Sequence, residues 1–426
     1  MTSRNRPGRR AVGPLIAVVA ALALPLLSPA TPATASPAAA ASPPAAAASS
    51  AAPWTGAWAT SPQRMVGPTF SRQTLRMLVH PTLGGTSLRI RLTNRFGAKD
   101  VTFGAVSVAR ATASGSADLV DGTSRSVTFH GRRSVTVKAG TQLFSDPVPL
   151  GIASGQDLAV DLYVTAGGDA AAITGHDGAQ GTQFVAAGNQ VGGAAAAFTG
   201  TVNSWFWLSG VDVRPARAVR GSIVALGDSI TDGAYTTWNG NDRWTDNLAD
   251  RLQALPAARQ FGVLNHGIGG NQILTDRTDC CGAGTSVSAL NRERQDVRLQ
   301  TRVKYLILAE GINDIGFNAD ADALIAGMRT IARRAHAAGI RVIGATITPY
   351  GCDSGCFGAE QEATRQKVNT WIRTSRVFDG VVDFDAAVRD PQNPSRLLPA
   401  YQADFLHPNI AGQQAMADSI NLNLFR

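Results

Sequence analysis

Residues 223–233 read Ile-Val-Ala-Leu-Gly-Asp-Ser-Ile-Thr-Asp-Gly, so four apolar residues run straight into a polar turn bounded by glycines. A short apolar run without alternation is typical of a strand that is buried on both faces. Similar runs recur downstream and alternate with helical patterns, which predicts a three-layer α/β fold built on a doubly wound parallel sheet. The predicted strands are 223–226, 263–265, 305–308, 342–347 and 381–384, and the predicted helices are 244–255, 321–338, 360–375 and 411–424.

Upstream of Arg217 the hydrophobic pattern changes to a period of two, which is typical of strands with one buried face. Turns that contain glycine separate these short segments, and no helical pattern appears. Such punctuation favours an antiparallel β-sandwich or jelly roll. The sequence therefore predicts a β-sandwich domain at 54–215 and an α/β domain at 219–426. The alternating segments are 75–79, 88–92, 127–129, 135–137 and 158–164, and 205–213 is the last predicted strand.

The N-terminal residues have the composition of an export signal followed by a tether. Four arginines precede an apolar run at 12–27, and small residues follow up to Ala35, which predicts a secretory signal peptide at 1–35. A membrane anchor is the alternative, but glycine and proline interrupt the run, which is shorter than the roughly 20 residues of a membrane span. The Ala/Pro/Ser-rich stretch 36–53 predicts an extended linker. We therefore expect a secreted protein without a stable membrane anchor, exported by the general or the twin-arginine route.

The charge pattern argues against a nucleic-acid partner. The full chain carries a formal charge of +8, and loss of residues 1–35 removes four arginines and no acidic residue. The remaining lysines and arginines are scattered and form no basic stripe interleaved with aromatic residues. Hydrophobic residues make up 44% of the chain and charged residues 16%, which is enough apolar material for a large core.

The four cysteines, Cys280, Cys281, Cys352 and Cys356, are expected to form disulfides in an exported chain. A bridge between Cys352 and Cys356 is favoured because it closes a short loop that contains glycine. The adjacent pair can form a vicinal bridge or cross to that loop, so three connectivities stay open. Zinc is the alternative, but no neighbouring histidine completes a site, and no metal is predicted.

Ser229 is the first candidate catalytic residue. It lies in Gly227-Asp228-Ser229-Ile230-Thr231, directly after the first predicted strand of the α/β domain. A serine at such a corner can present its hydroxyl above the edge of the sheet, close to backbone N–H groups. The alternative interpretation is that Asp228 and Ser229 only cap a turn.

Asp404 and His407 form the second candidate group, just before the last predicted helix. A carboxylate three residues before a histidine can reach its Nδ1 atom and leave Nε2 directed at a hydroxyl. The alternative is a histidine that caps the helix, with Pro408 at its start. Together with Ser229, however, the pair predicts a nucleophile, a base and an orienting carboxylate.

Two further polar segments follow predicted strands. Residues 310–314 read Glu-Gly-Ile-Asn-Asp, and residues 267–271 read Gly-Ile-Gly-Gly-Asn. The Asn313 amide and a glycine N–H are suitable donors to the oxyanion of a tetrahedral intermediate. Each glycine motif alone is weak, but motifs that follow strands of one parallel sheet are expected to meet at the same edge.

The combination of Ser229, Gly270, Asn313 and His407 resembles the SGNH, or GDSL-type, hydrolase family over roughly residues 219–426. The first block continues Ser-Ile-Thr instead of Ser-Leu, a variation that leaves the chemistry intact. Residues 54–215 lie outside that core and resemble the β-rich N-terminal extension of some exported bacterial members. The blocks that match are 227–229, 265–271, 311–314 and Asp404 with His407.

The resemblance implies a flavodoxin-like fold and a serine hydrolase mechanism without a cofactor. Ser229 would be the nucleophile, His407 its base and Asp404 the residue that orients His407. The N–H groups of Ser229 and Gly270 and the side chain of Asn313 would form the oxyanion hole. Ester hydrolysis would then proceed through an acyl-enzyme in two steps.

Other residues are candidates for additional roles at the site. His266 is a candidate second proton carrier or substrate contact, but a hydrogen-bonded histidine at a strand end is the favoured interpretation. Trp238, Trp244 and Tyr350 are candidates for a pocket that binds an acyl or aryl group, although packing under loops explains them at least as well. Three aspartates near the motifs raise a metal phosphoesterase as an alternative, but no histidine-rich ligand set accompanies them. Solvated roles suffice for the remaining histidines, which are His80, His130, His176 and His336.

The function predicted from the sequence is a secreted carboxylester hydrolase for short acyl or aryl esters, such as acetyl or feruloyl groups on carbohydrate. The expected partner is a small ester or a polysaccharide ester. One alternative is a lipase or phospholipase that acts on longer acyl chains. Another is an inert hydrolase fold that binds carbohydrate through the indoles of Trp54, Trp58, Trp205 and Trp207.

Overall fold

A computed structural model describes residues 52–278, 284–353 and 356–426, all of which belong to one compact unit that spans residues 50–426. The predicted signal peptide at 1–35, the predicted linker at 36–53 except its last two residues, and the pair Cys280 and Cys281 lie outside the described residues. In the part of the chain that the structure describes, no helix is both long and apolar enough to cross a membrane.

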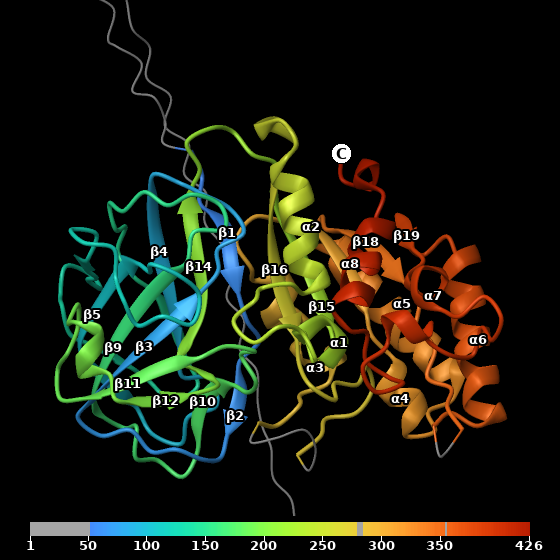
Figure 1. The fold of residues 1–426 in the computed structure, drawn as a ribbon, viewed down its shortest axis with the longest axis horizontal. Coiled ribbons are helices and arrows are strands. Elements are labelled where there is room, and N and C mark those ends of the chain that lie inside the picture. The colour runs from blue at the N-terminus through green and yellow to red at the C-terminus, as the bar shows by residue number, and fades with distance from the viewer. Residues whose placement is uncertain (1–51, 279–283, 354–355) are drawn as a thin grey trace, which may run out of the picture. The chain divides into compact units, whose positions relative to one another are not determined.

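The C-terminal half is built on a five-stranded, wholly parallel sheet (Figure 1). The strand order is β16-β15-β17-β18-β19, which in chain order is the 2-1-3-4-5 arrangement of flavodoxin-like folds. Ile223 to Leu226 are all fully buried, and because successive side chains point to opposite faces, both faces of β15 are covered. The strands are β15 Gly221–Gly227, β16 Phe261–Gly267, β17 Val303–Ala309, β18 Arg341–Ala345 and β19 Gly380–Val382.

Helices connect these strands and pack in two groups. In one group α2 packs against α8 and α8 against α7, and in the other α5 packs against α3 and α6. The helices are α1 Ser229–Asp232, α2 Trp244–Gln253, α3 Ala289–Glu293, α4 Ile312–Gly316, α5 Ala321–Ala337, α6 Ala359–Thr374, α7 Phe384–Val388 and α8 Ile410–Ser419. The predicted α/β fold is thus confirmed, and the helices that were predicted begin within about two residues of their expected positions.

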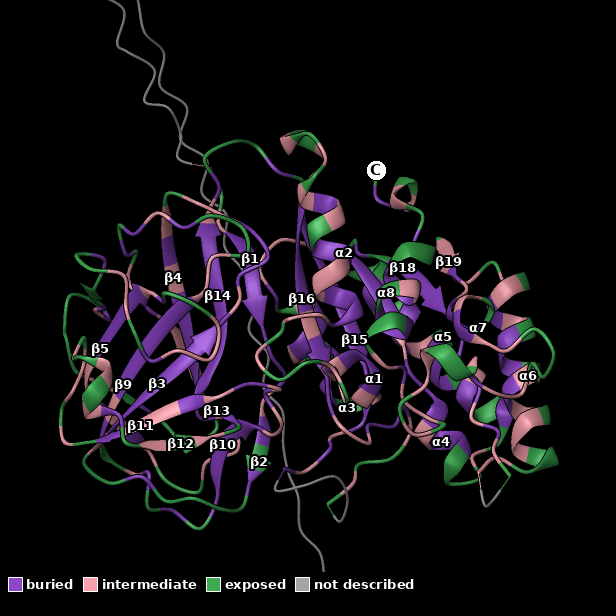
Figure 2. Ribbon diagram, viewed as in Figure 1, coloured by how far each residue is buried: buried purple, intermediate pink, exposed green. Residues whose placement is uncertain are grey.

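Residues 55–214 form antiparallel sheets, as predicted. One has the order β1-β14-β4-β8 and another the order β12-β11-β3-β9-β5-β6. Both sheets contain many buried residues, coloured purple in Figure 2, and these residues form one hydrophobic core. A small sheet, β13-β10-β2, lies beside them. The strands are β1 Thr55–Ala59, β2 Gln63–Met65, β3 Gln73–Val79, β4 Ser87–Thr93, β5 Val101–Arg110, β6 Arg125–Ser126, β7 Val135–Val137, β8 Gln142–Phe144, β9 Leu158–Ala166, β10 Ile173–His176, β11 Gln183–Ala187, β12 Gly200–Val202, β13 Trp205–Phe206 and β14 Leu208–Arg214.

The structure differs from the sequence-based expectation in several elements. The segment 127–129 is not a strand as predicted: β6 ends at Ser126, and Phe129 forms only an isolated bridge with Arg132. The strand predicted at 205–213 is two strands in different sheets, because Trp207 has a φ of 57° and turns the chain between them. The ten-residue strand β5 was missed, since register shifts near Gly104 interrupt its alternation. The helix predicted at 411–424 ends at Ser419, where the Asn421 side chain accepts a hydrogen bond from the Asn423 N–H and favours a tight turn.

Candidate active site

Ser229 lies at the carboxyl end of β15, where the strand turns directly into α1. The Asp228 carboxylate caps the helix by accepting a hydrogen bond of 2.9 Å from the Ile230 N–H. Gly227 is required at this corner, because a Cβ atom there would lie 2.1 Å from Thr231 Oγ1 and 2.9 Å from the Ala309 carbonyl oxygen. The tight turn therefore holds the serine at the edge of the sheet.

The structure joins Ser229, His407 and Asp404 in one hydrogen-bonded chain. Ser229 Oγ lies 2.9 Å from His407 Nε2, and His407 Nδ1 lies 2.8 Å from Asp404 Oδ2. Because Nδ1 faces a carboxylate, it carries the proton in the neutral ring and leaves Nε2 as the acceptor for the serine hydroxyl. The arrangement can activate an oxygen nucleophile.

The loop that carries Asp404 and His407 lies between a 3-10 turn at Pro399–Tyr401 and α8. Its position before the last helix agrees with the prediction, but it does not follow a strand directly as the other three motifs do. Asn409 fixes the loop by capping α8 through Gly412 and by donating to the carbonyl oxygens of residues 400 and 402.

Asp404 is held as a carboxylate. Partial burial acts to raise its pKa, but hydrogen bonds from the His407 N–H and ring and from the Leu406 N–H outweigh burial and lower the pKa below its ordinary value. Asp404 can therefore stabilise a positive charge on His407 when that ring takes the serine proton.

The predicted oxyanion donors come from the ends of β15, β16 and β17. Ser229 is the first residue of α1, where an N–H has no acceptor within the helix. Gly270 has a φ of 66°, a conformation that favours glycine. Asn313 Nδ2 donates to the Asn271 carbonyl oxygen at 2.9 Å, which ties Asn313 to the loop of Gly270 and leaves its second amide hydrogen for another acceptor.

A recess lies beside Asn313. It has about 730 Å³ of empty space, open solvent included, and contains the Asn313 side chain in its wall. Tyr350 and Phe357 pack edge to face there, with ring centroids 4.9 Å apart. The lining residues are Ile312, Asn313, Gly316, Phe317, Tyr350, Cys356, Phe357, Gln361 and Leu406.

Exposed aromatic side chains surround the candidate triad. Tyr235 is 56% exposed and its ring centroid lies 5.3 Å from that of His407. The charge of Asp404 and a hydrogen bond to it raise the pKa of the Tyr235 hydroxyl. Phe405, in the loop of His407, is 50% exposed, and both aromatic residues have positive φ angles. Backbone strain of this kind accumulates at functional sites.

Beneath the motifs lies a cluster of buried charged groups. Burial and the nearby charge of Asp314 raise the pKa of Asp228 to about 7. Burial likewise raises the pKa of Glu310, with Asp228 as the next contribution, and raises the pKa of Asp314 to about 6. Arg292 is the cation in contact with this cluster, at 3.1 Å from Glu310. Arg292 itself was not singled out in the sequence, because a charged residue in a short helix carries no mark of burial.

His266 has the favoured role of a hydrogen-bonded strand-end histidine, and His176 has a role other than the expected one. His266 is fully buried and its Nδ1 lies 3.0 Å from Ser61 Oγ, while burial lowers its pKa to about 3, so it is unsuited to carry a second proton for Ser229. His176 is buried, not solvated: its Nε2 lies 2.9 Å from Asp232 and its Nδ1 lies 2.9 Å from the Ser61 carbonyl oxygen.

The candidate aromatic residues differ in their burial. Trp58, Trp205 and Trp207 are buried in the β-rich core, and Trp54 stacks against the guanidinium groups of two arginines. The prediction of carbohydrate platforms is therefore wrong for Trp58, Trp205 and Trp207, because buried indoles cannot stack on a sugar. Trp244 is also fully buried and packs on Phe384, whereas Tyr350 does line the recess beside Asn313.

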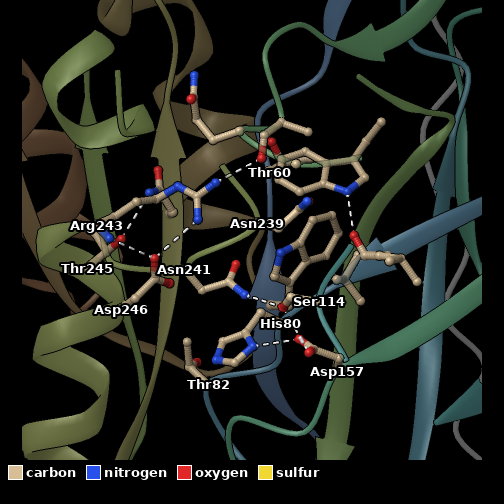
Figure 3. Close-up of a pocket in the computed structure, with 18 of the residues that line it drawn as sticks. Thr60, His80, Thr82, Ser114, Asp157, Asn239, Asn241, Arg243, Thr245 and Asp246 are labelled. Carbon is tan, nitrogen blue, oxygen red and sulfur yellow. Dashed lines mark hydrogen bonds and ion pairs between the residues drawn. The ribbon is translucent and has the colours of Figure 1, made fainter. Parts of the chain in front are cut away.

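A second pocket lies where residues of the β-rich half meet α2 and its preceding loop (Figure 3). Its polar side chains bind one another: Asn241 Nδ2 donates to Ser114 Oγ at 2.7 Å, Ser114 donates to Asp157 at 2.8 Å, and His80 lies 2.7 Å from Asp157. None of the candidate catalytic residues lines it. It is a polar seam between the two halves of the chain.

Cys352 and Cys356 form the disulfide that the sequence favoured, with Cα atoms 5.3 Å apart. Within residues 52–278, 284–353 and 356–426, no three His, Cys, Asp or Glu side chains gather in a way that could hold a metal ion.

Comparison with known proteins gives a family for this region. Residues 225–415 match the model of the GDSL-like Lipase/Acylhydrolase family. A search of curated proteins finds no match. Among solved structures, a member of the lipolytic protein G-D-S-L family from Veillonella parvula is 19% identical over 46% of this chain and 94% of that chain, with a TM-score of 0.33.

Two further solved structures have similar values. A GDSL-like lipase from Bacteroides thetaiotaomicron is 20% identical over 48% of this chain and 87% of its own, with a TM-score of 0.35. An acetyl xylan esterase is 18% identical over 46% of this chain and 96% of its own, with a TM-score of 0.35. Residues 225–415 are therefore a domain of the GDSL-like lipase/acylhydrolase (SGNH) family, an esterase and acylhydrolase family, and an antiparallel β-rich region precedes it.

Proposed function

We propose that this protein is a secreted carboxylester hydrolase that acts on short acyl or aryl esters of carbohydrates, such as acetyl or feruloyl esters. The observation that carries the proposal is the hydrogen-bonded chain from Ser229 through His407 to Asp404. The order of donors and acceptors in this chain is that of a serine nucleophile, a histidine base and a carboxylate that orients the base.

In the proposed mechanism Ser229 Oγ attacks the ester carbonyl while His407 Nε2 takes the hydroxyl proton. The carbonyl oxygen becomes an oxyanion, to which the N–H groups of Ser229 and Gly270 and the Asn313 amide donate. His407 then gives its proton to the leaving alcohol, and an acyl-enzyme forms. Water repeats the sequence, with His407 as its base, and releases the acid.

The surroundings of the triad support a small, partly aromatic substrate. The recess beside Asn313 is lined by Phe317, Tyr350 and Phe357, and flat rings of this kind stack on aryl groups and sugar faces. Because His407 protonates the departing oxygen, the alcohol must lie next to it, where the exposed Tyr235 ring is available for contact.

A lipase or phospholipase activity is the second candidate. Phe317, Phe405 and Ile410 are each about half exposed, and apolar side chains around a site can contact an aggregated lipid. The two candidates differ in the chain length that they predict and in the response to an emulsion.

Two measurements test the proposal. A fluorophosphonate should label the wild-type protein at Ser229 and leave Ser229→Ala unlabelled, whereas an inert binding protein would not react. A panel of 4-nitrophenyl esters of increasing chain length, with acetylated and feruloylated xylan beside it, should then show the highest kcat/KM for short acyl or aryl esters. Faster turnover of emulsified long-chain esters would favour the lipase.

A further inference from the structure

Arg292 is a buried arginine at the centre of the loops that carry the candidate oxyanion hole. It lies on α3 and is 2% exposed. Its guanidinium donates to the carbonyl oxygens of Gly227 at 2.9 Å and His266 at 2.8 Å, which are at the ends of β15 and β16. It also donates to Glu310, the first residue after β17, at 3.1 Å. One planar group thus contacts the ends of three neighbouring strands, β16, β15 and β17.

Each of the three oxyanion donors is close to an Arg292 contact along the chain. Ser229 follows Gly227 by two residues. Gly270 precedes Asn271, whose side-chain oxygen accepts hydrogen bonds of 2.9 and 2.8 Å from Arg292. Asn313 donates to the backbone oxygen of the same Asn271. The relative positions of all three donors therefore depend on groups that Arg292 holds.

The β-rich half supplies a further contact to this arginine. Ser61 lies between β1 and β2 and is fully buried. Its Oγ accepts a hydrogen bond of 3.0 Å from Arg292 and donates one of 2.9 Å to Asp296, which also accepts from Arg292 at 3.0 Å. With the serine proton given to Asp296, the His266 Nδ1–H is left to donate to Ser61 Oγ. Ser61 thereby fixes the arginine from outside the α/β region.

We propose that Arg292 is a positioning residue for the oxyanion hole, and that Ser61 of the β-rich region holds Arg292 in place. The inference rests on the proposed ester hydrolysis. Lysine cannot replace the arginine, because an ammonium group is a compact donor that lacks the planar fork needed to reach several carbonyl oxygens at once. Arg292→Lys keeps the positive charge beside the buried carboxylates and removes only that geometry.

The test measures kcat, KM and the inhibition constant of a trifluoromethyl ketone, which forms a tetrahedral adduct and occupies the oxyanion hole. Arg292→Lys should lower kcat by about 10- to 100-fold and weaken inhibition by a similar factor, with KM little changed. Ser61→Ala should produce the same pattern at smaller size, and Ser61→Thr, which keeps a hydroxyl, should recover part of the loss.

Arg365→Lys is the matched control. Arg365 is also fully buried and is paired with Asp385 at 2.7 Å and Glu362 at 2.7 Å, but its hydrogen-bond partners include none of residues 227–229, 266–271 and 310–314. Arg365→Lys should lower the melting temperature and leave kcat per folded molecule unchanged.

The outcomes separate this inference from the proposed function. A wild-type protein that neither hydrolyses esters nor reacts with a fluorophosphonate contradicts the proposed function. An active wild type with unchanged kcat and inhibition in a folded Arg292→Lys, or with equal losses in Arg365→Lys, overturns the positioning role. If Arg292→Lys does not fold, Ser61→Ala decides: parallel losses in kcat and inhibition support the role, and unchanged values overturn it.

Discussion

The two halves of the described chain place polar side chains in different positions. The parallel sheet of residues 221–382 places a serine, an asparagine and their loops at the carboxyl ends of its strands. The antiparallel half directs Ser61 and His176 inward, where they contact residues of the α/β region that lie behind or beside those loops. Ser229, Gly270 and Asn313 thus lie directly after strands, whereas buried polar groups that contact these loops come from both halves.

Two histidine–aspartate pairs differ in the partner of the histidine Nε2 atom. In the pair of His407 and Asp404, Nε2 faces the Ser229 hydroxyl. In the pair of His176 and Asp232, Nε2 faces the carboxylate and Nδ1 faces the Ser61 carbonyl oxygen, so both ring nitrogens have acceptor partners. The first histidine can exchange a proton with substrate, and the second is suited to hold the two halves together.

The largest effect is expected from Ser229→Ala. Without the hydroxyl, turnover should fall by a factor on the order of 10⁶, because the acyl-enzyme cannot form. Ester hydrolysis at saturating substrate checks this, with the melting temperature as the measure of folding. Ser222→Ala, at the other end of β15, is the control, since Ser222 Oγ only donates to backbone oxygens. Full activity in Ser229→Ala would place the chemistry elsewhere in the molecule.

The next effect is that of an oxyanion donor. Asn313→Ala should lower kcat by about 10² to 10³, because one donor to the tetrahedral intermediate is lost. Asn369→Ala is a control of the same chemistry: this fully buried asparagine binds only the backbone of Ile347. Comparable kcat losses in both variants would remove Asn313 from the oxyanion hole and assign it a structural role.

Much of the α/β region follows from its sequence, for a physical reason. A strand covered on both faces, such as Ile223 to Leu226, leaves an unbroken apolar run that no other element of that length produces. The contact between Asp404 and His407 is local, so a spacing of three residues is enough to predict it. The position of Ser229 beside this pair could be predicted from the apolar run and the local spacing together.

Contacts between residues that are far apart in the sequence produce no such sequence pattern. Ser61 and Arg292 are 231 residues apart in sequence, and neither belongs to a motif. Strand β5 also escapes the pattern, because its bulges shift the side chains between faces. A polar group can be buried only where the folded structure supplies its hydrogen-bond partners. A hydrophobic period of two or 3.6 residues contains no information about those partners.

The His176 pair predicts a pH effect on stability, not on the reacting atoms. Burial acts to lower the pKa of His176, but the charge of Asp232 and the hydrogen bond to it outweigh burial and raise the pKa above the ordinary value of 6.5. A raised pKa in the folded state means that the stabilisation is fully present below pH 6.5 and is lost as the pH rises through the folded value.

His176→Gln should therefore lower the free energy of unfolding by about 2 kcal/mol at pH 6 and by less at pH 9. Urea unfolding at several pH values measures this, and ester turnover at pH 7 should change little. His80→Gln should show a pH dependence of the same sign, because the pKa of His80 is also raised above its ordinary value and His80 lies 2.7 Å from Asp157. A loss in turnover without a change in stability would contradict the structural role of His176.

The smallest effect is expected from the disulfide, which lies beside the recess and not behind the triad. The bridge between Cys352 and Cys356 closes a very short loop, so its removal should cost about 2 kcal/mol of stability at most. Two backbone hydrogen bonds hold the same loop without it, from the Phe357 N–H to the Tyr350 oxygen at 3.0 Å and from the Gly351 N–H to the Ser395 oxygen at 2.7 Å.

Substitution of both Cys352 and Cys356 by serine should raise KM more than it lowers kcat, because Cys356 lines the recess beside Asn313 and has no bond to the chain of Ser229, His407 and Asp404. Steady-state kinetics with a short and an aryl ester, together with thermal unfolding, measure both quantities. A fall in kcat as large as that of Asn313→Ala would instead show that this loop holds the oxyanion hole. The residues that position the reacting groups would then include a surface loop of the α/β region as well as Ser61 of the β-rich half.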